Sequence, residues 1–406
     1  MGEKIALGFH TCVDYELIWD PEVIRKAIRD FGIRSAELEG EIRPDSERNV
    51  WRMVLAYMKA GIGAEILPDQ PEIVNAFADR FQYRVTIGGT AARAAIALAK
   101  IGYTSVLSMS SYNEWIAKLL PPQIRRFSNT GNAFGPVFPH ASFTYLGGQT
   151  IEESDICFTT ARENRILISR DEESARLAVS EDFAPELADA EVFLLSCFSQ
   201  ILDADVLADR IGKTHRLLSR LSENAVSIME DGNYVNQPFR TYVHQHLRDI
   251  VRVLSMNEDE LQEYTGRRID ILDPERVYQA VRETYQKAGF ETLIVHSSRW
   301  ALAYGKHARE CRQALNGGVT LAAARFRCGD RCGRTEYEET LTLPDNPEGA
   351  AFSERIRAIG GSDLACIPCK DMRSVMHPTV VGLGDTFAGG LLPGFLHAAE
   401  AHILTD

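Results

Sequence analysis

The chain has 406 residues, of which 45% are hydrophobic and 25% charged, and its formal net charge is −13. This composition is typical of a globular enzyme with one large domain or two ordinary ones, and it excludes a fibrous or disordered protein. The acidic balance argues against a general nucleic-acid or anionic-membrane binder, because both need a cationic surface. We find no secretory signal and no apolar run of membrane-spanning length, so we expect a cytoplasmic protein.

Short aliphatic runs alternate with longer amphipathic segments along most of the chain. The aliphatic runs are typical of buried strands, and the amphipathic segments of helices. This alternation predicts an α/β fold with a mainly parallel central sheet flanked by helices on both faces. The predicted strands are residues 4–9, 191–197, 224–229, 251–256 and 292–297, and two predicted helices are residues 203–223 and 273–289.

Two regions interrupt this alternation. Residues 14–50 and 138–182 contain β-prone segments that do not fit as strand–helix units of the main sheet. We predict that they form a smaller β-rich lid domain assembled from two separated stretches. The large α/β domain would then consist of residues 1–13, 51–137 and 183–406.

Paired glycines occur in "VTIGGTAARAAIALAKIG", residues 85–102, where Gly88 and Gly89 precede an alanine-rich stretch of high helix propensity. A substrate could rest against the backbone at that point. Close packing of helix on sheet is the simpler interpretation. The spacing is not G-x-G-x-x-G and therefore does not predict a dinucleotide site.

Acidic residues follow two neighbouring predicted strands. Glu230 comes directly after one strand, and Asn257, Glu258 and Glu260 follow the next. Carboxylates at adjacent strand ends suit Mg²⁺, which takes few carboxylates and keeps several waters. Taken singly, each is better explained as a charge at a helix N-terminus or on a solvated face.

The eight cysteines do not suggest a disulfide framework in a chain of this length. Cys328 with Cys332, and Cys366 with Cys369, form two close pairs that could supply zinc ligands. No helix or hairpin signal brings the pairs together, so reduced, unligated thiols are the preferred interpretation.

The stretch "VVGLGDTFAGGLLPGFL", residues 380–396, places Gly382, Gly384 and Asp385 before an apolar helical run. A helix N-terminus offers unpaired N–H groups and a positive dipole end, which favour a phosphate. Glycines let the backbone approach that anion closely. A carboxylate beside it suits a base that accepts a proton from an attacking hydroxyl, which indicates phosphoryl transfer to an alcohol. The alternative is an ordinary aspartate N-cap after a glycine turn.

These segments together resemble a known family. "IGGTAARAAIALAKIG", "SMNEDEL" and "TVVGLGDTFAGG" are similar to motifs of the ribokinase-like sugar kinase superfamily, and more closely to its ADP-dependent glucokinase/phosphofructokinase branch. That branch carries H-x-E, N-x-x-E and G-x-G-D motifs in this order. The matching positions are 228–230, 257–260 and 382–385.

The resemblance implies a role for each matching residue. Asp385 would be the catalytic base, and the backbone of Gly382, Leu383 and Gly384 would bind the phosphoryl group in flight, with Asn257 in the nucleotide site. Glu230 and Glu260 would organise Mg²⁺, largely through water. The sugar would be bound by Asp14, Gly88 and Gly89, and the lid arginines Arg162 and Arg165 would approach phosphate.

Two departures from the family pattern concern the donor and the acceptor. Ile228 replaces the histidine of H-x-E, and Cys12 stands where the sugar-binding turn has asparagine. The resemblance as a whole predicts a Mg²⁺-dependent kinase that uses ADP and phosphorylates a sugar or sugar phosphate of glucose or fructose 6-phosphate type. An ATP-dependent sugar or nucleoside kinase and a catalytically weak sugar or nucleotide sensor are the alternatives. The sequence leaves the oligomeric state open.

Overall fold

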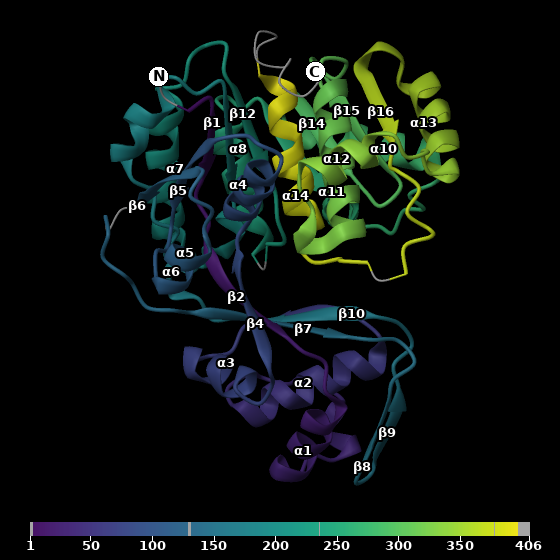
Figure 1. Ribbon diagram of the computed structural model, residues 1–406. Helices are drawn as coiled ribbons and strands as arrows, with labels where there is room; N and C mark the ends of the chain where they lie inside the picture. The colour runs from purple at the N-terminus through teal and green to yellow at the C-terminus, as the bar shows by residue number, and fades with distance from the viewer. Residues whose placement is uncertain (1–2, 129–130, 235, 377, 397–406) are drawn as a thin grey trace.

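The computed structural model describes residues 3–128, 131–234, 236–376 and 378–396. Figure 1 shows a large α/β unit joined to a smaller unit by a few strands and loops. No helix in these ranges has the length and apolar character that a membrane crossing requires. The cytoplasmic location stays a prediction.

The large unit is built on a nine-stranded sheet with the order β16-β15-β14-β13-β12-β11-β1-β5-β6. Seven neighbouring strands of this sheet are parallel to one another: β6, β5, β1, β11, β12, β13 and β14. Strand β15 pairs antiparallel with β14, and β16 pairs antiparallel with β15. The strands are β1 (Ile5–Gly8), β5 (Ser105–Met109), β6 (Ile124–Ser128), β11 (Val192–Ser196), β12 (Val226–Glu230), β13 (Val253–Asn257), β14 (Thr292–His296), β15 (Trp300–Gly305) and β16 (Leu364–Pro368). The five strands predicted from the sequence are confirmed.

Helices cover both faces of this sheet, as predicted (Figure 1). Alternate strand residues face opposite layers, so Ile5 and Leu7 pack on one side and Ala6 on the other. One layer holds α4 (Thr90–Lys100), α5 (Glu114–Leu119), α11 (Arg312–Cys328), α12 (Arg334–Leu341) and α14 (Leu383–Leu391). The other layer includes α7 (Ala204–Leu218), α8 (Gln237–Leu247), α9 (Glu258–Thr265), α10 (Pro274–Ala288) and α13 (Pro347–Gly360).

Capping residues mark where the two predicted helices begin and where one of them ends. Asp203 is the N-cap residue of α7 and Asp273 is that of α10, and each carboxylate accepts hydrogen bonds from backbone N–H groups of the first turn. Pro274 occupies the first position of α10, where its missing N–H costs nothing. Gly289 ends that helix in the left-handed conformation, with φ of 80°.

The small unit contains a five-stranded sheet with the order β3-β10-β7-β2-β4 and a separate β8-β9 hairpin. Its core gathers large aromatic side chains, including Trp51, Phe77 and Phe143. The strands are β2 (Cys12–Leu17), β3 (Ala64–Ile66), β4 (Tyr83–Gly88), β7 (Pro139–Tyr145), β8 (Thr150–Glu153), β9 (Ile156–Thr159) and β10 (Asn164–Ile168), and the helices are α1 (Pro21–Phe31), α2 (Glu47–Ala60) and α3 (Pro71–Ala78).

The predicted division of the chain needs correction at two places. Residues 51–88 were expected in the large domain, but β3 and β4 pair in the small sheet, and α2 and α3 pack on it. Residues 172–182 were expected in the lid, but Leu177 and Val179 belong to the core of the large unit. An amphipathic pattern shows that a helix covers a sheet and does not show which sheet.

Helix α14 is placed by glycine contacts with α11. A Cβ at Gly390 would lie 2.6 Å from the carbonyl oxygen of Gly317, and one at Gly317 would lie 2.3 Å from that of Gly390. The two backbones therefore approach more closely than any side chain allows. The position of Asp385, in the first turn of α14, depends on this contact.

We expect Gly390→Ala to lower the free energy of unfolding by about 1–3 kcal/mol, because the added methyl group overpacks the α11–α14 contact. Gly212→Ala, in α7, is the matched control. A Cβ at Gly212 would meet only the Arg216 side chain at 3.6 Å, so this change should be neutral or stabilising. Urea denaturation of both variants tests the claim, and equal stabilities would contradict it.

Candidate active site

A cavity of about 150 Å³ lies where the two units meet. It is lined by β2, β7 and β10 residues of the small unit and by residues at the N-termini of α4 and α14 in the large one. Five residues predicted from the sequence reach it: Asp14, Gly89, Arg165, Gly382 and Asp385. Residues far apart in the chain thus line one cavity.

The turn into α14 has the geometry that the glycine motif predicts. Gly382 is the N-cap residue with φ of 72°, a left-handed conformation that glycine adopts without strain. Its carbonyl oxygen accepts hydrogen bonds from the Thr386 hydroxyl at 2.7 Å and the Thr386 N–H at 3.0 Å. The N–H groups of the first turn have no intrahelical partner and point toward the helix N-terminus, where an anion can bind them. Asp385 is 25% exposed beside them.

Arg93 joins the acidic residues of the two units. Its Nη2 lies 2.6 Å from Oδ2 of Asp14 and 3.8 Å from Oε1 of Glu16, and its Nε lies 3.8 Å from Oδ2 of Asp385. A Cβ at Gly382 would lie 2.6 Å from Nη1 of Arg93, so any other residue here would displace this guanidinium. The side chain is 10% exposed. A guanidinium therefore lies between the predicted sugar-binding aspartate and the predicted base.

Sequence reasoning did not single out Arg93. The available signal was a charged residue in the first turns of an otherwise apolar, alanine-rich helix, whose other charged residue, Lys100, lies at its end. Its partners are distant in sequence, so the signal did not identify them.

Positive charge near Asp14, above all that of Arg93, favours the ionised form of its carboxyl group. Burial by itself would raise the pKa of the Asp14 carboxyl, but Arg93, together with His140 and Arg165, outweighs burial and lowers that pKa below its ordinary value of 3.8. The carboxylates in turn raise the pKa of Arg93. Asp14 is therefore an anion with one oxygen already held.

Gly88 and Gly89 serve close packing. A Cβ at Gly88 would lie 2.3 Å from Oδ1 of Asp14, and one at Gly89 would lie 2.6 Å from the carbonyl oxygen of His10. Gly89 also has φ of 89°. These glycines let β4 and the start of α4 lie against β2 and the segment before it, and Gly89 lines the cavity as well.

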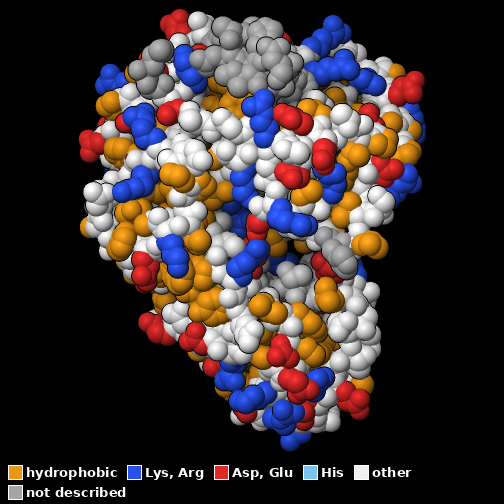
Figure 2. All heavy atoms as spheres, viewed as in Figure 1, with side chains coloured by type: hydrophobic (Ala, Val, Ile, Leu, Met, Phe, Trp, Pro, Cys, Tyr) orange, Lys and Arg blue, Asp and Glu red, His pale blue; other side chains and the backbone are white. Residues whose placement is uncertain are grey.

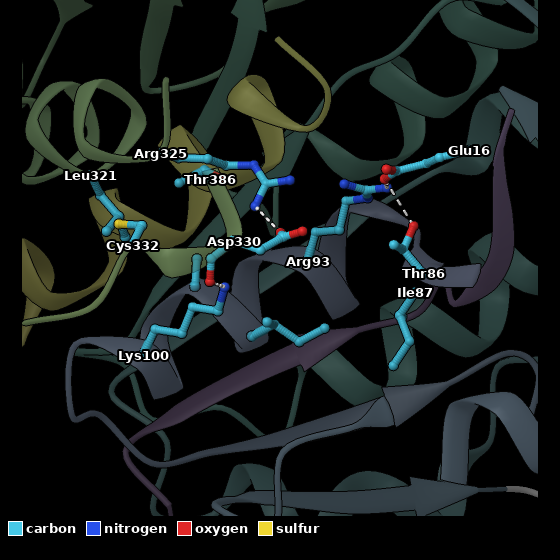
Figure 3. Close-up of a pocket in the computed structure, with 12 residues that line it drawn as sticks. Glu16, Thr86, Ile87, Arg93, Lys100, Leu321, Arg325, Asp330, Cys332 and Thr386 are labelled. Carbon is cyan, nitrogen blue, oxygen red and sulfur yellow. Dashed lines mark hydrogen bonds and ion pairs between the residues drawn. The ribbon is translucent and has the colours of Figure 1, made fainter. Parts of the chain in front are cut away.

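A second cavity of about 90 Å³ lies behind Arg93, between α4, α11 and the strands β2 and β4 (Figure 3). Here Arg84 of β4 forms ion pairs with both Glu16 and Asp330. Asp330 also pairs with Arg325 at 3.2 Å, and its carbonyl oxygen accepts a hydrogen bond from Lys100 at 2.8 Å. This ion cluster ties the small sheet to the end of α11 in the large unit.

The acidic residues after β12 and β13 form a separate buried group. Asn257 accepts hydrogen bonds from the N–H groups of Asp259 and Glu260, both at 2.9 Å, and Glu260 accepts one from the Asn257 N–H at 2.9 Å. The N-x-x-E motif is therefore a capping box for α9. Burial and the charges of Asp231 and Glu230 raise the pKa of Glu260 well above 4.5.

Glu230 connects this acidic group to α14. Its Oε1 lies 3.1 Å from Nε2 of His296, whose ring packs against Phe387 with centroids 4.3 Å apart. Its Oε2 is buried and has no hydrogen-bond partner among the described residues. Ile228, two residues earlier, is fully buried in the core.

The predicted lid arginines occupy a larger cleft of about 1040 Å³ beside the cavity. Figure 2 shows Lys and Arg side chains around the hollow between the two units. The Nε of Arg162 donates to the carbonyl oxygen of Gly61 at 2.9 Å. Arg165 lines both the cleft and the cavity, and its guanidinium forms no ion pair or hydrogen bond within the described part of the chain.

The two cysteine pairs considered as zinc ligands do not form one cluster. Cys366 lies in β16 beside Ser353, with 3.3 Å between its sulfur and the hydroxyl oxygen, and Cys369 follows that strand. Cys328 and Cys332 lie at the end of α11. All four are free thiols in the structure.

The fold and the cavity define a class of protein. Three features are typical of a small-molecule kinase. They are a largely parallel sheet with a small β-rich unit beyond the carboxyl ends of its strands, a helix N-terminus that can bind an anion, and a carboxylate beside that N-terminus. A model of the ADP-specific phosphofructokinase/glucokinase conserved region matches residues 3–392, and the chain belongs to this family. The family predicted from the sequence is confirmed, and with it an ADP-dependent sugar kinase.

Similar proteins agree with this assignment. An ADP-specific phosphofructokinase of Thermococcus kodakarensis is 24% identical, with 97% of this chain and 96% of that protein covered. The crystal structure of a phosphofructokinase from Pyrococcus horikoshii with AMP has a TM-score of 0.79 at 17% identity, covering 99% of both chains. An ADP-dependent kinase complex with fructose-6-phosphate and ADPβS has a TM-score of 0.74 at 16% identity, covering 97% and 93%. These structures share the fold of this chain.

The Arg93–Asp14 pair makes a pH-dependent contribution to stability. Because the pKa of Asp14 is lowered in the folded state, this contribution is present above the ordinary value of 3.8 and is lost as the pH falls through the folded-state pKa. We expect Asp14→Asn to cost about 1.5–3 kcal/mol at pH 7, the range for a hydrogen bond to a charged group. The difference from wild type should shrink toward pH 3.

Denaturant unfolding of both proteins across this pH range measures the difference. Asp69→Asn is the control, because Asp69 pairs with an Arg43 that is 76% exposed. It should show little effect at any pH. A pH-independent cost for Asp14→Asn would contradict the electrostatic explanation.

Proposed function

We propose that Asp385 accepts the proton of a sugar hydroxyl while that oxygen attacks the terminal phosphorus of ADP, producing a phosphorylated sugar and AMP. The observation that carries this assignment is the carboxylate in the first turn of α14, beside unpaired N–H groups and facing the cavity. The bond from the bridging oxygen to that phosphorus breaks, and AMP leaves with the electron pair. The hydroxyl proton passes to Asp385.

The backbone at the start of α14 would stabilise the transferring group. The N–H groups of Leu383, Gly384 and Asp385 have no partners within the helix and lie at its positive end. They are fixed before the reaction starts, so negative charge developing on the phosphoryl oxygens meets donors that need no reorganisation.

Arg93 would couple the acceptor to the base. It holds Asp14 ionised and in place, so the second oxygen of Asp14 can accept a hydrogen bond from a sugar hydroxyl. The same guanidinium lies 3.8 Å from Asp385. Acceptor and base would therefore be positioned by one side chain.

The acidic group suits Mg²⁺. Oε2 of Glu230 is buried without a partner among the described residues, and burial together with the charges of Asp231 and Glu230 raises the pKa of Glu260. A cation would relieve both conditions. Glu230 and Glu260 would hold it largely through water, and Mg²⁺ would supply charge neutralisation for the nucleotide phosphates.

The favoured acceptor is a phosphorylated sugar of fructose 6-phosphate type. Support comes from Arg165, whose guanidinium is unpaired among the described residues and lines both the cavity and the arginine-rich cleft next to it. A sugar bound at Asp14 would carry its phosphate toward this group. Arginine is well suited to such a dianion because it can bind it with two parallel hydrogen bonds.

A coupled assay with Mg·ADP and Mg·ATP in parallel, over a panel of sugars and sugar phosphates, tests the reaction. We expect turnover with ADP, release of AMP, and a loss of about 10²–10⁴-fold in kcat for Asp385→Asn with sugar binding retained. Asp79→Asn, at the end of α3, is the matched control and should leave kcat unchanged. Full turnover by Asp385→Asn would refute the mechanism. Activity with ATP alone would refute the donor.

Arg165→Met tests the acceptor class separately. We expect KM for the sugar phosphate to rise about 10–100-fold, as losing a charge-assisted hydrogen bond of about 1.5–3 kcal/mol implies, with little change for an unphosphorylated sugar. Arg334→Met, which removes an exposed pair with Glu338, is the control. An unchanged KM for every sugar phosphate would exclude Arg165 as the phosphate ligand.

A further inference from the structure

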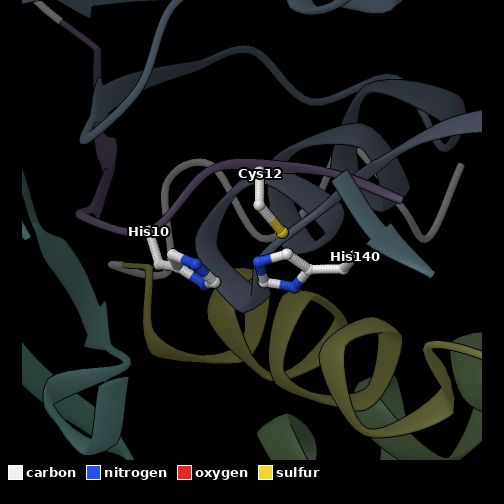
Figure 4. Close-up of side chains that lie close together, drawn as sticks. All are labelled: His10, Cys12 and His140. Carbon is white, nitrogen blue, oxygen red and sulfur yellow. The ribbon is translucent and has the colours of Figure 1, made fainter. Parts of the chain in front are cut away.

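Three side chains with nitrogen or sulfur atoms converge at the wall of the cavity in a way that the proposed reaction does not use. They are His10, from the segment between β1 and β2, Cys12 at the start of β2, and His140 in β7. One ring nitrogen of each histidine and the cysteine sulfur all lie within 4.8 Å of one another. Figure 4 shows the three side chains pointing toward a common space.

This cluster is shielded from water. His10 is 4% exposed, Cys12 is 3% exposed and His140 is 5% exposed. Buried imidazoles and thiols normally have partners. Nδ1 of His10 is buried and makes no hydrogen bond of ordinary geometry in the described structure, and the Cys197 thiol is the neighbouring group that interacts with this ring. The Cys12 sulfur has only a long contact of 3.5 Å to Oδ1 of Asp14. The polar atoms of the cluster are thus poorly satisfied by the protein.

An outer layer of hydrogen bonds fixes the two rings. Nε2 of His10 lies 2.7 Å from the Ser174 hydroxyl, and Nε2 of His140 lies 3.1 Å from Oδ2 of Asp171. Ser174 donates to that same carboxylate oxygen at 2.6 Å. A carboxylate that orients histidines is the usual surrounding of a protein metal site.

We propose that His10, Cys12 and His140 form a binding site for a thiophilic divalent cation such as Zn²⁺, and that the cation excludes the sugar acceptor. Two imidazoles and one thiolate are a common ligand set for zinc, with water or a carboxylate in the fourth position. Zn–N distances of about 2.0–2.1 Å and a Zn–S distance of about 2.3 Å require the ligand atoms to move together by roughly 1 Å. Small side-chain rotations about these hydrogen bonds would have to supply that movement.

The chemistry of the cluster selects against Mg²⁺. Mg²⁺ is a hard cation that prefers oxygen ligands. Two imidazoles and one thiol instead suit a metal with strong affinity for nitrogen and sulfur. The site is therefore distinct from the acidic group after β12 and β13.

The effect on turnover rests on the proposed function. His10, Cys12 and His140 line the same cavity as Asp14 and Asp385, so a bound cation occupies the space expected for the sugar. Inhibition should be competitive with the acceptor and not with Mg·ADP.

Binding is tested first, with no need for turnover. Co²⁺ added to the full-length protein should produce a thiolate-to-cobalt charge-transfer absorption, and Zn²⁺ should displace the Co²⁺ with one equivalent bound. Excess Mg²⁺ should leave the spectrum unchanged. Absence of the absorption band, or its loss on adding Mg²⁺, would overturn the proposal.

Variants locate the cation. Cys12→Ser, Cys12→Asn and His140→Gln should each abolish the band and weaken Zn²⁺ binding by at least about 10–100-fold, since even outer-layer partners are worth that much. Cys157→Ser is the matched control, because Cys157 is an exposed thiol on β9. Two replacements at position 12 and one at position 140 protect the test against a variant that fails to fold. A band that survives all three changes would overturn the assignment.

Steady-state kinetics give the second arm. At saturating Mg·ADP, Zn²⁺ should raise KM for the acceptor in the wild type and in Cys157→Ser, and it should do so at least tenfold less in Cys12→Asn. Inhibition competitive with Mg·ADP would overturn the placement in the acceptor cavity. If no acceptor is turned over, the cobalt spectrum still decides whether the site exists, so failure of the proposed function and failure of the metal site remain distinguishable.

Discussion

The structure depends on one buried guanidinium. Arg93 lies among Asp14, Glu16 and Asp385, carboxylates that come from both units. Without it, three negative charges would face one another at low exposure. Breaking a buried ion pair by removing one partner costs about 3–5 kcal/mol, because the charge left behind is uncompensated. Arg93 therefore both joins the two units and sets the electrostatics of the cavity.

This arrangement explains why the glycines around the cavity are needed. Gly382 leaves room for Arg93, Gly88 leaves room for Asp14, and Gly390 lets α14 approach α11. Each glycine permits a close approach that a Cβ would prevent. Close backbone packing therefore positions the elements of the site, and this packing restricts where the few charged side chains can lie.

Much of the fold and part of the site could be predicted from the sequence, because those features depend on local pattern. The aliphatic strands from β11 to β14, the caps of α10 and the glycine turn at Gly382 are all encoded within short segments. The extent of the small unit was not predicted, since α2 and α3 have the same amphipathic pattern as helices on the main sheet.

Arg93 and the histidines at positions 10 and 140 were also missed. Their roles depend on contacts between residues up to about 300 positions apart in the chain, such as the contact between Arg93 and Asp385. No local pattern records such a pairing, and the sequence alone left Asp14 without its partner.

The topology also has a consequence for how the chain folds during synthesis. Every strand of the small sheet lies between Cys12 and Ile168, so this sheet can be completed as soon as that length has left the ribosome. Strand β1 pairs with β11 in the register Ile5 with Val192, and it must wait for that partner with one edge open. We therefore expect the unit made mostly from the earlier half of the chain to fold first. Strand β1, an interior strand of the larger sheet, is synthesised at the outset but can be fully paired only late.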